Sequence, residues 1–131
     1  MPNRAMIPET VAPPLGAYSH AVEIAAGARV MHLAGQVGIA KDGSVPADFR
    51  AQAELAWANC VAILVDNGMT LNDVVKINHF ITRPDDIPEY AAIRPGLLGD
   101  ARPASTLLVV AGLARPDLLI EVEMIAAKTA G

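Results

Sequence analysis

The acidic residues near the end of the chain are the first candidates for chemistry. Glu121 and Glu123 lie two positions apart in the aliphatic segment 118–126, which has the composition of a β-strand. Because side chains alternate between the two faces of a strand, both carboxylates are expected on one face. Such a carboxylate can activate water for attack on a ligand, or it can lie on a wet face and pair with a cation. The sequence leaves both alternatives open.

The histidines and the cysteine offer weaker candidates. His79 lies in an apolar row of alternating residues, where a histidine is more often a hydrogen-bonded structural residue than a catalyst. The single cysteine, Cys60, excludes an internal disulfide and a cysteine-based metal cage, and its neighbours indicate a small buried residue. The 3 histidines do not share a metal-ligand spacing, and no nucleotide-binding glycine motif is present. The sequence therefore predicts neither a metal nor another cofactor.

Composition and charge narrow the class of protein. The chain has 131 residues, of which 53% are hydrophobic and 18% charged, and its formal net charge is −4. These values predict one folded domain over residues 1–131 and exclude a disordered chain. The acidic balance and the lack of a basic cluster argue against nucleic-acid binding. No apolar run has the length of a membrane span, and the first residues lack the apolar core of a signal peptide, so a cytoplasmic protein is expected.

Periodicity and turn residues predict the elements that must position these side chains. Prolines crowd the first 15 residues, and residues 1–12 are expected to form an irregular arm. Strands are expected at residues 16–24, 29–38, 73–82, 102–111 and 118–126, and helices at residues 48–68 and 86–99. The order β-β-α-β-α-β-β predicts an α+β domain, with a mixed sheet and two helices on one face.

Local signals refine these boundaries. Ser44 is a candidate cap for the first helix, and Asp86 with Glu89 has the spacing of a capping box at the start of the second. Pro95 should shorten or kink the second helix, because it clashes with the carbonyl four residues back. Gly35 interrupts the second expected strand, where a glycine often marks a bulge or a close approach by another group.

Five segments, in order along the chain, resemble the sequence of one known family. They are residues 16–20 (Gly-Ala-Tyr-Ser-His), 34–37 (Ala-Gly-Gln-Val), 71–76 (Leu-Asn-Asp-Val-Val-Lys), 102–104 (Arg-Pro-Ala) and 120–126 (Ile-Glu-Val-Glu-Met-Ile-Ala). The family is RidA/YjgF, also called the endoribonuclease L-PSP family. The resemblance extends from residue 10 to residue 127, and the five segments are specific together although each is weak alone.

This resemblance implies a chorismate-mutase-like fold and a homotrimer, with the sheets in a central barrel, the helices outside and three clefts between subunits. It also implies hydrolysis of small 2-enamine or 2-imino acids to 2-keto acids and ammonia, without metal or cofactor. In the best-known members a glutamate on the last strand handles the attacking water, and an arginine binds the substrate carboxylate.

Carried onto this sequence, the resemblance gives Glu121 the catalytic role and makes Tyr18 and Gly35 substrate-binding residues. The family's carboxylate-binding arginine follows the Pro-Ala pair, and Ser105 stands at that position here. The hydroxyls of Ser105 and Thr106 are then expected to line the substrate site.

Two arginines are candidates to supply the missing charge. Arg102 lies three positions before Ser105 in the expected strand, an odd offset that places it on the other face, and Arg94 lies on the second expected helix. Charge-assisted hydrogen bonds contribute roughly 1.5–3 kcal/mol each, so losing the guanidinium weakens carboxylate binding substantially.

Two hypotheses of different class follow. The first is a hydrolytic deaminase of enamines, imines or related compounds, with Glu121 handling water. The second is a non-catalytic ligand-binding or regulatory trimer, as the serine at position 105 suggests. RNA cleavage, which the older family name suggests, ranks third because a basic patch and an acid–base pair of His or Lys are both missing from the sequence.

Overall fold

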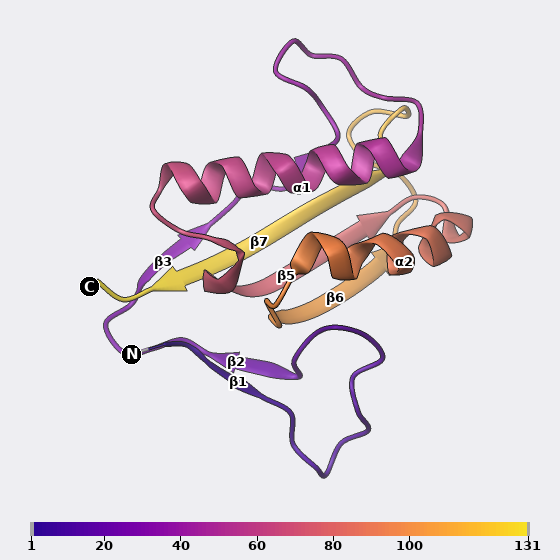
Figure 1. Ribbon diagram of the computed structural model, residues 1–131. Coiled ribbons are helices and arrows are strands. Elements are labelled where there is room, and N and C mark those ends of the chain that lie inside the picture. The colour runs from indigo at the N-terminus through magenta and orange to yellow at the C-terminus, as the bar shows by residue number, and fades with distance from the viewer. Residues whose placement is uncertain (1, 131) are drawn as a thin grey trace.

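The centre of the protein is one mixed β-sheet, described by a computed structural model that covers residues 2–130 (Figure 1). The strands follow the order β3 (Arg29–His32), β7 (Ile120–Lys128), β5 (Val74–Ile81) and β6 (Ala104–Val109). The short strand β4 (Gln36–Val37) also pairs with β7. The β5–β6 pair is parallel and the other pairs are antiparallel, which confirms the mixed sheet.

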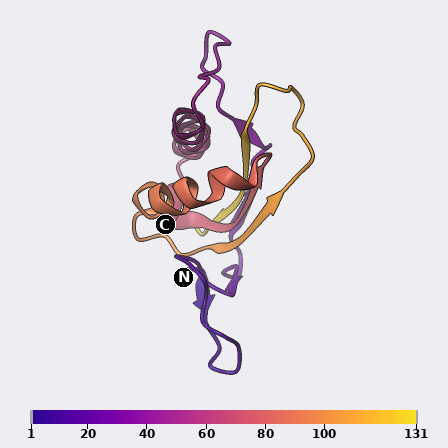
Figure 2. The same cartoon turned by 90° about the vertical axis from the view of Figure 1, so that its right-hand side faces the viewer.

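Both long helices cover the same face of this sheet, as predicted (Figure 2). They are α1 (Phe49–Asp66) and α2 (Ile87–Leu98). Two short 3₁₀ turns, η1 (Leu71–Asp73) and η2 (Pro84–Asp86), come directly before β5 and α2 respectively. Within residues 2–130 the opposite face carries no helix, and we call it the open face. The α+β architecture predicted from the sequence is therefore confirmed.

The core lies between the sheet and the helices. On β7, alternate residues point toward the helices and are fully buried: Ile120, Val122, Met124 and Ala126. The apolar stripe of α1 meets them with residues spaced three and four apart: Ala53, Ala56, Cys60 and Leu64. Cys60 is 0% exposed, and burial raises the pKa of its thiol to about 12, which keeps it protonated and unreactive.

The N-terminal arm contains regular structure that the sequence did not predict. Strand β1 (Arg4–Met6) pairs antiparallel with β2 (Ala21–Glu23) in a separate small sheet below the main one in Figure 1. The irregular arm predicted for residues 1–12 is therefore wrong at residues 4–6. The strand predicted at residues 16–24 is confirmed only at β2, and it joins the main sheet through one parallel bridge, Ser19 to Ala104. Local periodicity is too weak here to identify a strand that exists through its partner.

The helix ends differ from the sequence predictions in two places. Asp48, not Ser44, caps α1, because its extended backbone lets the carboxylate accept a hydrogen bond from the Ala51 amide at 3.0 Å. Ser44 instead binds Asp42 within the preceding loop. Asp86 makes no capping hydrogen bond, because its carboxylate binds the guanidinium of Arg83 at 2.8 Å.

The expected shortening of the second helix by Pro95 is also wrong. Helix α2 continues to Leu98 with Pro95 inside it, and Gly99 ends it with a positive φ of 60°. Proline removes one hydrogen bond of the helix, and the turn beyond it remains closed because the Gly99 amide donates to the Pro95 carbonyl at 3.0 Å.

Candidate functional site

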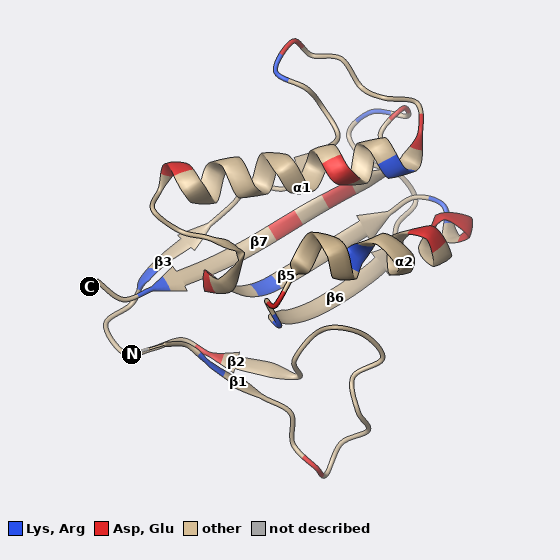
Figure 3. Ribbon diagram, in the orientation of Figure 1, with Lys and Arg blue, Asp and Glu red and all other residues tan. Residues whose placement is uncertain are grey.

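The two glutamates of β7 share the open face, as the alternation predicted. Figure 3 shows them as two acidic stretches on the central strand, and both side chains are partly exposed. Glu123 accepts a hydrogen bond from Asn78 Nδ2 of the adjacent strand β5 at 2.9 Å. Glu121 pairs across the sheet with Phe80 on one side and Val37 on the other, neither of which offers a side-chain donor. Glu123 is thus bound within the sheet, whereas Glu121 remains available.

Gly35 packs directly against Glu121. It lies between β3 and β4, the two segments into which the strand predicted at residues 29–38 is divided. A Cβ atom at Gly35 would lie 2.7 Å from Glu121 Cδ and closer still to Glu121 Oε2. A side chain at position 35 would therefore displace the Glu121 carboxylate from this position, and the predicted close approach by another group is confirmed. We call Gly35 and Glu121 the glutamate half-site.

Ser105 and Thr106 point to opposite faces of the sheet. In the parallel β5–β6 pair, Ser105 lies beside Ile77, whose side chain is buried under the helices. Thr106 lies beside Asn78 on the open face, where its hydroxyl accepts a hydrogen bond from Lys76 Nζ at 2.7 Å. One chain therefore cannot present both hydroxyls to the same small ligand, contrary to the pairing expected from the sequence.

A buried hydrogen-bond chain ends at the hydroxyl of Ser105. Trp57 Nε1 donates to the Tyr90 hydroxyl oxygen at 3.0 Å, the Tyr90 hydroxyl contacts His79 Nδ1, and His79 Nε2 lies 2.9 Å from Ser105 Oγ. The hydroxyl of Tyr90, which is 0% exposed, has no other hydrogen-bond partner within residues 2–130, so its proton must go to His79 Nδ1. His79 then carries its own proton on Nε2 and donates it to Ser105. We call this set the serine relay.

Burial keeps the serine relay neutral. Desolvation, with smaller contributions from Arg94 and Lys76, lowers the pKa of His79 to about 3, and burial raises the pKa of Tyr90. His79 is therefore a buried hydrogen-bonded residue, as its apolar row indicated. Trp57 and Tyr90 are not among the site residues predicted from the sequence. The overlooked signal is that a buried tryptophan or tyrosine needs a partner for its polar atom.

Tyr18 and Arg94 gather beside the first residues of β6. The neighbour of Tyr18, Ser19, is tied to this edge because its amide donates to the Pro103 carbonyl at 3.0 Å. A Cβ atom at Gly16 would lie 3.0 Å from Arg94 Nη2 and 3.9 Å from Tyr18 Cδ2, so both side chains surround this point. The Arg94 guanidinium carbon also lies 5.7 Å from the ring centroid of Tyr90, a member of the serine relay. We call Tyr18, Arg94 and Ser105 the serine half-site.

Arg102, the other candidate to replace the missing arginine, has a structural role. Its Nη1 donates to the carbonyls of Gly99 at 2.8 Å and Ala101 at 2.7 Å, just past the end of α2. It therefore stabilises the helix end.

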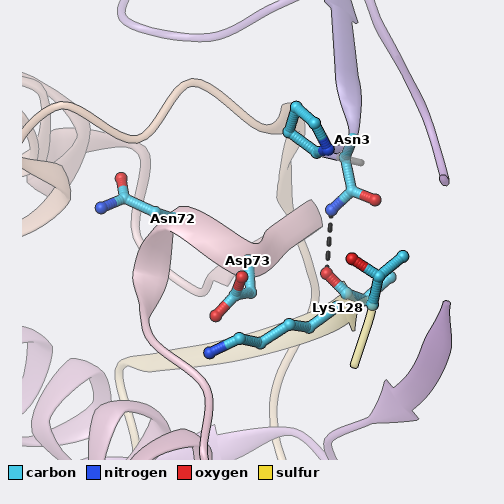
Figure 4. A pocket seen from close by; sticks show the side chains of 7 residues that line it. Asn3, Asn72, Asp73 and Lys128 are labelled. Carbon is cyan, nitrogen blue, oxygen red and sulfur yellow. Dashed lines mark hydrogen bonds between the residues drawn. The ribbon is translucent and has the colours of Figure 1, made fainter. Parts of the chain in front are cut away.

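The polar hollow near the chain ends holds none of the predicted site residues. It measures about 310 Å³ and is lined by Asn3, Asn72, Asp73 and Lys128 among others (Figure 4). Asn3 Nδ2 donates to the Ala127 carbonyl, Lys128 Nζ to the Gly68 carbonyl, and the Asp73 carboxylate accepts from the Thr70 amide. These contacts attach the arm and η1 to the end of β7, so we assign the hollow a structural role.

Neither a metal centre nor a membrane span is found in the described part of the chain. Residues 2–130 contain no group of three or more His, Cys, Asp or Glu residues placed to hold a metal ion. Over the same residues, no helix combines the length and the apolarity needed to cross a bilayer.

The mixed sheet with two helices on one face defines a small α+β protein of the chorismate-mutase-like class. The family model described as Endoribonuclease L-PSP matches residues 9–128. A RutC family protein of Pyrococcus abyssi is 30% identical over 130 residues, covering 98% of this chain and 99% of the relative. A 2-iminobutanoate/2-iminopropanoate deaminase of Dermatophagoides farinae is 30% identical over 128 residues, covering 95% and 97%.

The structural comparison agrees. The crystal structure of YyfB from Yersinia pestis, described as a protein of unknown function of the conserved Rid family, is 33% identical with a TM-score of 0.87. The match covers 98% of this chain and 100% of YyfB. The chain therefore belongs to the endoribonuclease L-PSP family, also known as RidA/YjgF.

Proposed function

We propose that this protein forms a homotrimer whose clefts bind a small metabolite, each cleft combining the glutamate half-site of one copy with the serine half-site of another. One observation carries the proposal. Glu121 on the open face of β7 and Ser105 on the helix-covered face of β6 have the whole of β5 between them. Two strand spacings amount to roughly 10 Å, so one copy cannot place both on a small ligand.

Within this cleft we propose hydrolysis of a carbon–nitrogen double bond. Glu121 takes a proton from water as the water oxygen bonds to the imine carbon, and it returns that proton to the nitrogen, which gives a carbinolamine. The carbinolamine hydroxyl then loses its proton to the same nitrogen, the carbon–nitrogen bond breaks, and ammonia leaves as the keto group forms. The carboxylate of Glu121, which occupies the space left by the missing side chain of Gly35, supports this role. The Dermatophagoides relative, a 2-iminobutanoate/2-iminopropanoate deaminase, supports the same chemistry.

The direct test uses 2-aminoacrylate, generated by a serine dehydratase in the presence of the purified protein. Release of pyruvate should be faster than the spontaneous rate, and Glu121→Gln should reduce this acceleration by about 10²–10⁴-fold, the usual contribution of a general base. Glu123→Gln is the matched control, because that carboxylate is bound to Asn78 on the same face. If the protein does not accelerate keto-acid release over the spontaneous rate with any of several amino-acid precursors, the proposed chemistry is wrong.

A non-catalytic ligand-binding trimer is the second candidate, because Ser105 stands where the resemblance implies an arginine. It predicts no turnover and an affinity for ligand that Glu121→Gln leaves nearly unchanged. Sedimentation analysis separates both candidates from failure of the assembly itself: a monomer at micromolar concentration contradicts the two-copy cleft.

A further inference from the structure

Two amide side chains of α1, Gln52 and Asn59, bind the two backbone segments that flank Glu121. They lie seven positions apart, close to two full turns of an α-helix, so both project from the same side of α1. Glutamine and asparagine are usually exposed, yet Gln52 is 0% exposed and Asn59 is partly buried. A buried amide needs hydrogen-bond partners, and these two find theirs outside the helix. We call Gln52 and Asn59 the amide anchors.

Gln52 holds the segment that leads into β7. Its Nε2 donates to the carbonyls of Pro46 at 2.8 Å and Asp117 at 2.9 Å, which uses both amide hydrogens. Its Oε1 accepts a hydrogen bond from the Leu119 amide at 2.8 Å. Leu119 lies only two positions before Glu121, so these bonds fix the point at which β7 begins and where the Glu121 side chain leaves the sheet.

Asn59 holds the short strand β4 on the other side of Glu121. Its Nδ2 donates to the carbonyls of Val37 at 3.2 Å and Ile39 at 3.0 Å. Val37 is the residue of β4 that pairs with Glu121. Strand β4 has only 2 residues, fewer than a typical strand, so its own ladder supplies few bonds. The bonds from Asn59 therefore contribute a large share of what keeps β4 beside β7.

Both anchors act on the contact between Gly35 and the Glu121 carboxylate. Gly35 lies directly before β4, so any shift of β4 moves this contact. The segment after β4 also packs on the other anchor, because a Cβ atom at Gly38 would lie 2.6 Å from Gln52 Cα. Since both anchors are neutral amides, they hold the backbone without adding a charge to the glutamate half-site.

We infer that Gln52 and Asn59 are positioning residues for Glu121: from one side of α1 they hold β7 and β4 in the register that sets Gly35 against the Glu121 carboxylate. Neither anchor touches the ligand, and each acts through the backbone that it binds. The inference rests on the proposed function for the use that the protein makes of Glu121.

The first test observes the Glu121 carboxylate itself, by carbon NMR of the intact protein with its glutamate carboxyl groups isotopically labelled. Asn59→Ala should move the Glu121 signal and leave the Glu123 signal in place, because Asn78 holds that second carboxylate. Asn67→Ala is the matched control and should move neither signal, since the Asn67 amide binds only the Ile63 carbonyl of its own helix.

The second test separates positioning from general damage to the structure, using turnover of 2-aminoacrylate. Asn59→Ala should lower kcat by roughly 10–100-fold with KM changed less than about threefold, because a small misplacement of a catalytic group can cost about 10²-fold. In a Glu121→Gln background the same substitution should change the residual rate less than about twofold, because residues that act through one group are not additive. Asn67→Ala should leave both parameters close to wild type.

Three outcomes separate this inference from the proposed function. If Asn59→Ala is folded by circular dichroism and the Glu121 signal stays where it is in wild type, the inference is wrong, whatever the turnover. If Asn59→Ala lowers the rate by the same factor with and without Glu121, its role is only structural and the inference is overturned. If the Glu121 signal moves while the wild-type protein shows no turnover, the positioning stands and only the proposed hydrolysis fails.

Discussion

The two faces of the sheet differ in how their polar side chains are hydrogen-bonded. On the helix-covered face, Trp57, Tyr90 and His79 satisfy one another and end at Ser105. On the open face, Lys76, Asn78, Glu121 and Glu123 lie in the same sheet but remain partly exposed, and Glu121 has no side-chain donor beside it. The comparison shows that one face is completed by its own chain, whereas the other leaves its central carboxylate available to water or a ligand.

The largest expected loss of stability comes from a substitution in the hydrogen-bond chain on the helix-covered face. Tyr90→Phe removes only a hydroxyl, but it leaves both Trp57 Nε1 and His79 Nδ1 buried without a partner. Because each unsatisfied buried group costs about 1–3 kcal/mol, the free energy of unfolding should fall by about 2–4 kcal/mol in urea denaturation.

The matched change is Tyr18→Phe. The Tyr18 hydroxyl accepts one hydrogen bond from the Leu15 amide at an exposed site, so less than about 1 kcal/mol should be lost. Equal losses in the two variants would contradict the contrast between the faces.

The second-largest expected effect is a fall in the free energy of unfolding in acid, caused by His79 on the helix-covered face. The folded-state pKa of His79, about 3, lies below its ordinary value of 6.5, so the unfolded chain binds a proton that the folded chain excludes. This contribution to stability is therefore complete above pH 6.5 and is lost as the pH drops toward 3, by at most about 1.4 kcal/mol per pH unit and by about 2.5 kcal/mol between pH 6 and 4.

Denaturation of His79→Gln at several pH values tests this dependence. The variant should lose that part of the slope between pH 6 and 4, while His32→Gln, at an exposed position on β3, should keep it. A slope in His79→Gln equal to that of wild type would show that His79 is not the group responsible.

A smaller effect is expected where the glutamate half-site is crowded. Gly35→Ala places a methyl group against the Glu121 carboxylate, which should cost about 1–2 kcal/mol and move the carboxylate from its position. Turnover, if present, should fall together with stability. Gly96→Ala is the control, because no atom lies within 4 Å of its Cβ position in α2, and it should stabilise by up to about 1 kcal/mol.

The smallest effect sharpens the comparison from the open face. Thr106→Val removes the acceptor of Lys76 Nζ at an exposed site, so unfolding should change by no more than about 1 kcal/mol. A loss as large as that of Tyr90→Phe would mean that the open face depends on internal hydrogen bonds after all. Thermal unfolding at fixed protein concentration measures the difference.

Some features of this protein followed from local pattern alone. The two-residue period of segment 118–126 determined that Glu121 and Glu123 share a face, and the spacing of apolar residues determined the stripe of α1. Gly35 signalled a close approach by its presence inside a strand pattern. These properties depend on neighbouring positions of the chain, so the sequence contains them directly.

The assembly of the site depended on contacts between distant segments, which only the tertiary structure decided. The register of β6 against β5 put Ser105 under the helices and Thr106 on the open face. The packing of the 16–19 segment brought Tyr18 and Arg94 together at Gly16, whereas Arg102 binds a carbonyl at the end of α2. Strand register and helix packing are chosen by the fit of the whole core, so no local period specifies them.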